Sequence, residues 1–181
     1  MNGTLEFDEL SSGEVSSEQA LALFDELEPV NLEFMLGRWP GHGFPTGHRM
    51  DGLLEHFHWY GKVFENTETV HPLVFQHRNE KQLCLNPIWF PLRMAARSPV
   101  SMSAITSRVF DWAMPLLQTR RSRARLRMTE YRGKVSATMV YDHKPINDVF
   151  RKIDDNRVLG LMDQKGGGAR PFFFVLERIV E

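Results

Sequence analysis

Seven histidines give this sequence its widest choice of chemistry, because imidazole binds metals and transfers protons near neutral pH. A single residue separates His56 from His58, so their rings would share a face on a strand, although not on a helix. No cysteine, aspartate or glutamate completes a recognisable metal-binding spacing around them. We therefore expect no metal site. For His143 we favour a solvent-exposed position at the end of a strand.

Three aspartates could act as general acids or bases, since such work needs carboxylates with tuned pKa values. Each also has a structural explanation. Asp142 could cap a short helix that begins at Pro145, and Asp148 could favour the dipole of that helix. Asp163 could shape a turn. The sequence has no nucleophile elbow or phosphate-binding loop. A structural role is favoured, and catalysis by Asp142, His143 or Asp163 is the alternative.

Composition points to an ordinary globular protein with one core. The chain has 181 residues, of which 42% are hydrophobic and 25% are charged. The formal net charge of −1 supplies no long-range field to attract nucleic acid or a membrane. Alternation places the arginines at 123–127 on one solvated sheet face, without interleaved aromatic rings, so nucleic acid is not an expected partner.

The expected location is the cytoplasm. The single cysteine, Cys84, excludes an internal disulfide and a cysteine-based metal cluster, and it fits a reducing compartment. The first residues are acidic and rich in serine and glycine, unlike an export signal. No run of about 18 apolar residues could span a membrane.

The chain is expected to contain a loosely ordered lead over residues 1–14 and a single domain over residues 15–181. A capping signal at Ser16 and helical spacing predict a helix that ends at Pro29. Further along, the patterns predict a helix over residues 48–59, strands over 61–64, 71–76 and 82–85, and a helical excursion over 98–118 with Ser103 as its cap and Pro115 as its kink or end.

Two antiparallel hairpins are predicted within residues 123–181. Apolar and polar residues alternate on both sides of a turn at Gly133, and a second pair of strands flanks the glycines at 166–168. Between the hairpins, Pro145 suits the first turn of a short helix through Phe150. Successive hairpins favour a mainly β fold, which we predict to be an antiparallel β-barrel with an N-terminal helix and helical insertions.

One motif in the sequence resembles a known family. The segment Gly37-Arg38-Trp39-Pro40-Gly41 resembles the signature of the bacterial family named for its GXWXG motif. The segments 141–151, 160–163 and 172–178 resemble the domain of unknown function that accompanies this motif. The resemblance covers residues 32–178, with the GXWXG segment over about 32–93, and the family has no established activity.

A looser similarity extends to lipocalins, fatty-acid-binding proteins and nitrobindin-type haem proteins, whose first strand also carries Gly-x-Trp. It implies a calycin-like barrel in which Gly37 and Gly41 let the backbone bend and Trp39 covers one end. In such barrels an arginine of the final strand commonly lies over this tryptophan. Arg178 is the matching candidate, so a Trp39–Arg178 stack is predicted.

The same similarity raises the question of haem. Nitrobindin-type barrels hold iron through a histidine near the end of the chain, but residues 171–181 contain none. His143 or His42 could substitute only if they project into the barrel. The favoured expectation is therefore that no cofactor is bound, and a haem-binding, nitrobindin-like protein is kept as a further alternative.

The predicted function is to hold a small apolar molecule, such as a fatty acid, an aromatic metabolite or a tetrapyrrole, inside the barrel. The wall positions chosen by alternation are Trp89, Phe90, Leu126, Met128, Met139, Tyr141, Leu161 and Phe174. Trp112 is added to the pocket because its helix could plug or cover the mouth of the barrel. An enzyme that uses the same pocket and a filled barrel that serves as an interaction module are the alternatives. The last strand, 172–180, is apolar on both faces, so its outer face should meet a helix or a second subunit, as in a homodimer.

Overall fold

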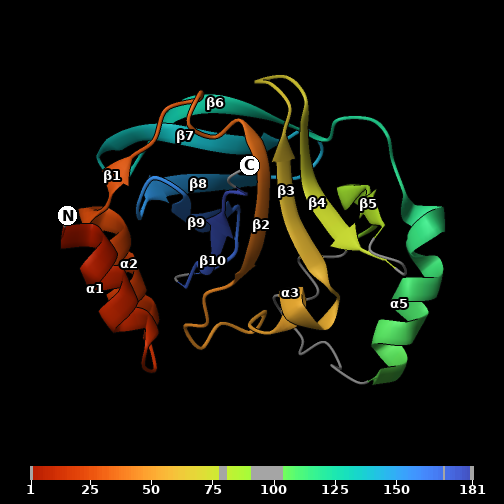
Figure 1. Ribbon diagram of the computed structural model, residues 1–181, viewed down its shortest axis with the longest axis horizontal. Helices are drawn as coiled ribbons and strands as arrows, with labels where there is room; N and C mark the ends of the chain where they lie inside the picture. Colours follow the sequence, from red (N-terminus) through yellow and green to blue (C-terminus); the bar gives the residue numbers. More distant parts are fainter. Residues whose placement is uncertain (1, 78–80, 91–103, 169, 180–181) are drawn as a thin grey trace.

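Ten strands form one antiparallel sheet in the computed structural model, which describes residues 2–77, 81–90, 104–168 and 170–179. Eight of the strands close into a ring, because β8 pairs with both β7 and β9 (Figure 1). In ring order they are β2 (Gly37–Gly43), β3 (Trp59–Phe64), β4 (Val70–Gln76), β6 (Ala124–Tyr131), β7 (Lys134–Tyr141), β8 (Ile146–Lys152), β9 (Arg157–Gln164) and β10 (Phe172–Glu177). The predicted β-barrel is confirmed.

Two short strands extend the sheet beside the ring. β1 (Glu28–Pro29) pairs with β8, and β5 (Gln82–Cys84) pairs with β4. The pairing between β4 and β6 is the shortest in the ring, because a single residue pair, Val70 and Ala124, joins these two strands.

The alternation of apolar and polar residues predicted the first hairpin correctly. In β6 and β7, Leu126 lies opposite Met139 and both are fully buried, while Arg125, next to Leu126 on β6, is exposed. The chain reverses at Arg132 and Gly133, both with positive φ, which matches the predicted turn. β9 and β10 form the second predicted hairpin.

The prediction of a short helix after Pro145 is wrong. Residues 146–152 form the strand β8, where Val149 pairs with Thr138 on one side and Leu161 on the other. A strand hydrogen-bonded on both sides gains more from the sheet than Pro145 gains from starting a helix. The helix roles expected for Asp142 and Asp148 therefore do not apply.

The structure also differs from two other expectations. Residues 2–11, expected to be loosely ordered, form helix α1 (Asn2–Ser11), whose Phe7 stacks on Phe44 at 5.4 Å between ring centroids. The helix expected over residues 48–59 is reduced to the short α3 (Leu53–His56), preceded by Gly52 at φ +79°.

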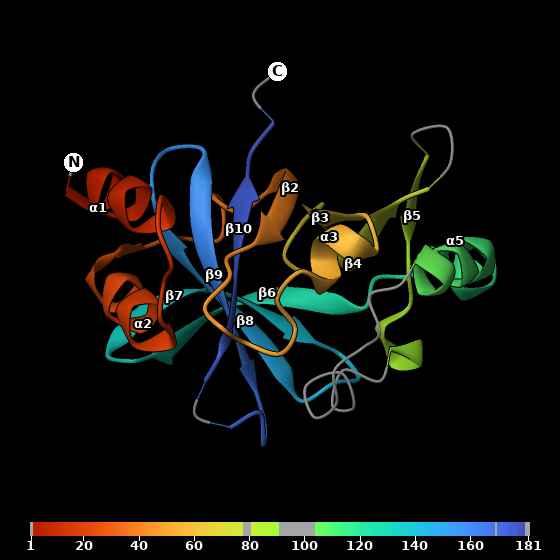
Figure 2. The same cartoon turned by 90° about the horizontal axis from the view of Figure 1, so that it is seen from below.

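The outer face of β9 and β10 is covered by α1 and by α2 (Ser17–Glu26), which lie side by side in Figure 2. Ser16 and Gln19 form the predicted capping box of α2. Phe24 packs edge-on against Phe173, 6.3 Å between centroids. The second apolar face of the last strand is thus covered by helices.

On the opposite flank stand the 3₁₀ turn η2 (Pro87–Trp89) and helix α5 (Ala104–Leu117) (Figures 1 and 2). Phe110 anchors α5, because its ring contacts Phe57, Phe75 and Phe90 at 4.8–5.8 Å. Pro115 lies in the last turn, so the helix ends soon after it. The expected cap Ser103 lies outside the described residues. None of the described helices is long and apolar enough to cross a membrane.

Candidate functional site

A buried ion pair spans the interior of the barrel. Lys62 Nζ lies 2.8 Å from Asp148 Oδ2, and the two side chains are only 3% and 2% exposed. Lys62 is on β3 and Asp148 is on β8, which stand four strands apart in either direction around the ring. The pair therefore joins opposite walls.

Aromatic rings surround this pair. The Lys62 ammonium lies 4.9 Å from the ring centroid of Phe174, 5.4 Å from that of Trp59 and 5.9 Å from that of Tyr141. It also donates to the carbonyl oxygen of Pro72 at 3.3 Å. Cation–π contacts of this kind strengthen when water is excluded.

The carboxylate of Asp148 keeps one oxygen free. Asp148 Oδ1 is buried and has no hydrogen-bond partner within the described part of the chain. Burial raises the pKa of Asp148 above its ordinary value, although the neighbouring Lys62 opposes that rise. Burial also raises the pKa of the Tyr141 hydroxyl well above its usual range. A buried ion pair commonly costs more in desolvation than it gains, so this pair is a candidate functional feature.

Trp59 separates the ion pair from a cleft at the mouth of the barrel. The cleft has a volume of about 510 Å³, within the range of small-molecule sites. We call it the Trp59 cleft; its lining residues are Glu55, His58, Trp59, Gln76, His77 and Asp111. These come from α3, α5 and the ends of β3 and β4.

Two residues that line the Trp59 cleft have buried polar atoms without partners among the described residues. Trp59 is 7% exposed, and its Nε1 has no hydrogen-bond acceptor among the described residues. His77 Nδ1 is likewise buried and unpaired there. His58 has φ +56°, an uncommon backbone conformation for a residue other than glycine. Unsatisfied donors and strained backbone both cluster at ligand-binding sites.

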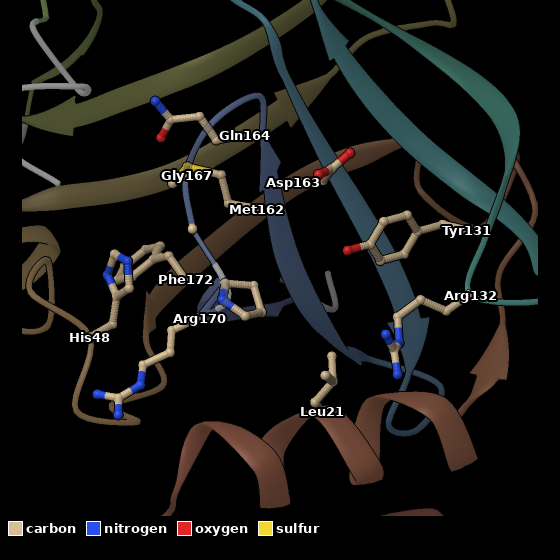
Figure 3. Close-up of a pocket in the computed structure, with 12 residues that line it drawn as sticks. Leu21, His48, Tyr131, Arg132, Met162, Asp163, Gln164, Gly167, Arg170 and Phe172 are labelled. Atoms are coloured by element: carbon tan, nitrogen blue, oxygen red, sulfur yellow. The ribbon is translucent and has the colours of Figure 1, made fainter.

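A smaller cavity of about 130 Å³ lies beside the tip of the β9–β10 hairpin (Figure 3). Its lining includes Asp163 together with Leu21, His48, Tyr131, Arg132, Met162, Gln164, Gly167, Gly168, Arg170, Pro171 and Phe172. His48 and Arg170 lie on one side of the hairpin, and Tyr131 and Arg132 lie on the other. Burial lowers the pKa of His48, which favours its neutral form. The cavity is too small for most ligands, and Phe172, stacked on Phe174, separates it from the ion pair.

The predicted catalytic residues do not meet at the ion pair. Asp142 is exposed and pairs with Arg125 at 2.9 Å, and His143 is exposed. Asp163 lines only the smaller cavity. Lys62 was missed, although a single charge within the apolar strand Trp59–Phe64 is a signal that could have identified it.

Four predicted wall residues, Leu126, Met139, Tyr141 and Phe174, do lie buried in the interior core, and Phe90 packs against it. Leu161 is buried on the outer face, beneath α2. Trp89, Trp112 and Met128 are 66%, 73% and 42% exposed, so their assignment to an inner wall is wrong. Trp89 and Trp112 belong to segments that leave the barrel. Met128 lies further along β6 than Ala124, the residue through which β6 pairs with β4.

The Trp39–Arg178 stack is confirmed. Trp39 is fully buried and donates from Nε1 to the Met35 carbonyl at 2.8 Å. The Arg178 guanidinium lies 4.6 Å from the Trp39 ring centroid, and it donates to the Phe34 carbonyl. The motif thus closes one end of the barrel.

The final glycine of the motif also positions the site. A Cβ on Gly41 would come within 2.7 Å of the Trp59 ring. Only glycine lets the β2 backbone approach the indole this closely. The motif strand therefore packs directly against Trp59, one of the residues that line the cleft.

Replacing Arg178 with alanine should lower the free energy of unfolding by about 1–3 kcal/mol, because a partly buried stack and hydrogen bond are lost. Urea denaturation measures the change. Arg38→Ala is the matched control, since Arg38 stacks on Tyr60 but is exposed. Equal small effects of both substitutions would show that the Trp39 stack does not stabilise the barrel.

The histidines considered for haem do not fit that role. His42 and His143 are both exposed, and the His42 ring lies 3.8 Å from Glu177 at the surface. Neither projects into the barrel, so neither can ligate iron there. Among the described residues, no three His, Cys, Asp or Glu side chains form a metal-binding group.

Comparisons with known proteins agree with this architecture. Residues 22–79 match the GXWXG protein family, and residues 122–178 match a domain of unknown function, DUF4334. This chain joins a GXWXG segment to a DUF4334 segment. A protein from Thermomonospora curvata, known from its crystal structure, is 29% identical, with a TM-score of 0.73 over 99% of this chain and all of that one. A search of curated proteins found no match.

The two segments share the site. The GXWXG segment supplies Trp59 and Lys62, whereas the DUF4334 segment supplies Asp148 and Phe174. Neither segment alone contains the ion pair.

Proposed function

We propose that this protein binds a small, mainly apolar molecule that carries a hydroxyl group. The hydroxyl would lie at the Lys62–Asp148 pair among the rings of Trp59, Phe174 and Tyr141, and the ligand would enter through the Trp59 cleft, whose other lining residues are polar. The observation that carries this proposal is the free, buried Asp148 Oδ1 beside an ammonium group.

A hydroxyl suits both members of the pair. It can donate to Asp148 Oδ1 and accept from the Lys62 ammonium at the same time. A carboxylate ligand would instead meet the negative charge of Asp148. Leaving a buried acceptor unpaired costs about 1–3 kcal/mol, which the ligand would recover on binding.

The rings around the pair suit an apolar body. Trp59 and Phe174 meet edge to face at 5.9 Å, and both lie over the Lys62 ammonium. Trp59 faces the cleft as well as the pair, so its side chain must move for a ligand to reach Asp148. Its unpaired Nε1 supplies a further donor.

The test compares 1-naphthol with naphthalene, which has the same ring system without the hydroxyl. Isothermal titration calorimetry should show that 1-naphthol binds at least about tenfold more tightly, because only it can bond with the ion pair. The charge-free variant Lys62→Met/Asp148→Leu should remove this preference. Its aromatic surroundings remain, so naphthalene affinity should be little changed.

Asp163→Asn is the control, because Asp163 lines the cavity in Figure 3 rather than the Trp59 cleft. It should retain the preference for 1-naphthol. Equal affinities of the two compounds for the unmodified protein would refute the proposal. So would a preference that survives in the double variant.

A further inference from the structure

Helix α5 carries an apolar stripe that faces solvent. Ile105, Val109, Trp112 and Leu116 have 59–76% of their surfaces exposed. Their spacing of four, three and four residues places them on one side of the helix. Met114, on the other side, is fully buried. The helix is thus apolar on two faces, but the barrel covers only one.

Positive charge is frequent in the part of the sequence that contains this stripe. Between Pro91 and Arg127 the sequence has eight arginines, no lysine and one acidic residue, Asp111, which is a formal charge of +7 in a chain whose total is −1. Arg108 flanks the stripe, and Arg120 and Arg121 follow the end of α5; all three are exposed. Arg125 and Arg127 of β6 do not add to the positive charge beside the stripe, because they pair with Asp142 and Glu68.

The negative charge of Asp111 does not lie on the exposed side of α5, so it does not offset the arginines there. It lines the Trp59 cleft, on the side of α5 that faces the barrel. The outward side of α5 therefore combines aliphatic residues, a tryptophan and Arg108, and two further arginines follow the end of the helix. This combination is typical of helices that lie in the interface of an anionic bilayer.

We infer that α5 docks the protein on the surface of an anionic lipid bilayer. The stripe Ile105–Val109–Trp112–Leu116 enters the boundary between headgroups and acyl chains, and Arg108, Arg120 and Arg121 contact lipid phosphates. Trp112 lies at the headgroup level, where tryptophan is favoured. α5 lies at the flank opposite α1 and α2 (Figure 2), and the four side chains of its stripe are exposed.

A second copy of the chain is a less suitable occupant. Joining two stripes would bring together two copies of a surface that carries Arg108, with Arg120 and Arg121 close by in sequence. Like charges brought together oppose association, whereas anionic lipid attracts them. This inference does not depend on the proposed ligand.

Flotation of the full chain with lipid vesicles tests the inference. The protein should float with vesicles of equal parts phosphatidylcholine and phosphatidylglycerol, and at least about tenfold less with phosphatidylcholine alone. Val109→Glu/Leu116→Glu and Arg120→Glu/Arg121→Glu should each reduce flotation by a similar factor. All four positions are exposed, so thermal melting should be unchanged.

Matched controls lie away from α5. Leu5→Glu changes an exposed leucine of α1, and Lys165→Glu/Arg170→Glu reverses two exposed charges at the β9–β10 tip. Both should float normally. The inference is overturned if the unmodified chain does not float, or if the controls lose as much binding as the α5 variants. A dimer in light scattering that Val109→Glu/Leu116→Glu dissociates would assign the stripe to a second copy instead.

Discussion

Asp148→Asn is expected to lower the free energy of unfolding by about 3–5 kcal/mol, because it leaves the Lys62 ammonium buried without its counter-charge. Urea denaturation at neutral pH measures this loss. Replacing both partners, as in Lys62→Met/Asp148→Leu, should cost far less, since no charge is then buried. Asp142→Asn is the control: its pair with Arg125 is exposed and should contribute no more than about 1 kcal/mol.

The single variant Lys62→Met adds a pH dependence to the same experiment. Burial already raises the pKa of Asp148, and removal of Lys62 takes away the influence that lowers it. The folded state then binds a proton more strongly than the unfolded state, so stability should fall as pH rises above the ordinary aspartate pKa of about 3.9. A loss in Lys62→Met that is the same at pH 5 and pH 8 would contradict this account, as would a double variant less stable than either single one.

Gly61→Ala is expected to destabilise the protein by more than about 3 kcal/mol or to prevent folding. Gly61 has φ +141°, and a Cβ there would lie 1.9 Å from the Trp39 carbonyl oxygen and 3.0 Å from the Gly41 nitrogen. The pairing of β2 with β3 leaves no room for either neighbour to move. Circular dichroism and thermal melting measure the loss.

Gly166→Ala separates this clash from backbone strain. Gly166 also has a positive φ, +75°, but no atom beyond its two neighbours in the chain lies within 4 Å of the position of its Cβ. Its substitution should therefore cost only the left-handed backbone, about 1–2 kcal/mol. Similar effects of the two substitutions would mean that β2 can retreat from β3.

Local patterns predicted much of the barrel. Alternation in β6 and β7 identified the hairpin and its buried face, as shown by Leu126 and Met139. The resemblance to calycin barrels predicted the stack of Arg178 on Trp39. The strand β8 was missed because its buried residues do not alternate and because Pro145 imitates a helix start.

The sequence could have singled out Lys62, but it could not predict that Lys62 pairs with Asp148. Lys62 and Asp148 are 86 positions apart, on strands that are not neighbours in the sheet. Only closure of the ring places them opposite each other. Trp112 was misplaced for a related reason: helical spacing identifies an apolar side of α5 but does not show which side the barrel will cover.

Closure of the ring by β10 has a consequence for how the chain folds. β2, near the start of the barrel, pairs with β10, where Gly41 lies opposite Leu176. Such distant pairing gives a high contact order, so barrel closure should be a slow step. During synthesis, β2 and β9 present unpaired edges until residues 172–177 leave the ribosome, and exposed edges favour aggregation. The last strand therefore protects the chain from self-association as well as completing its core.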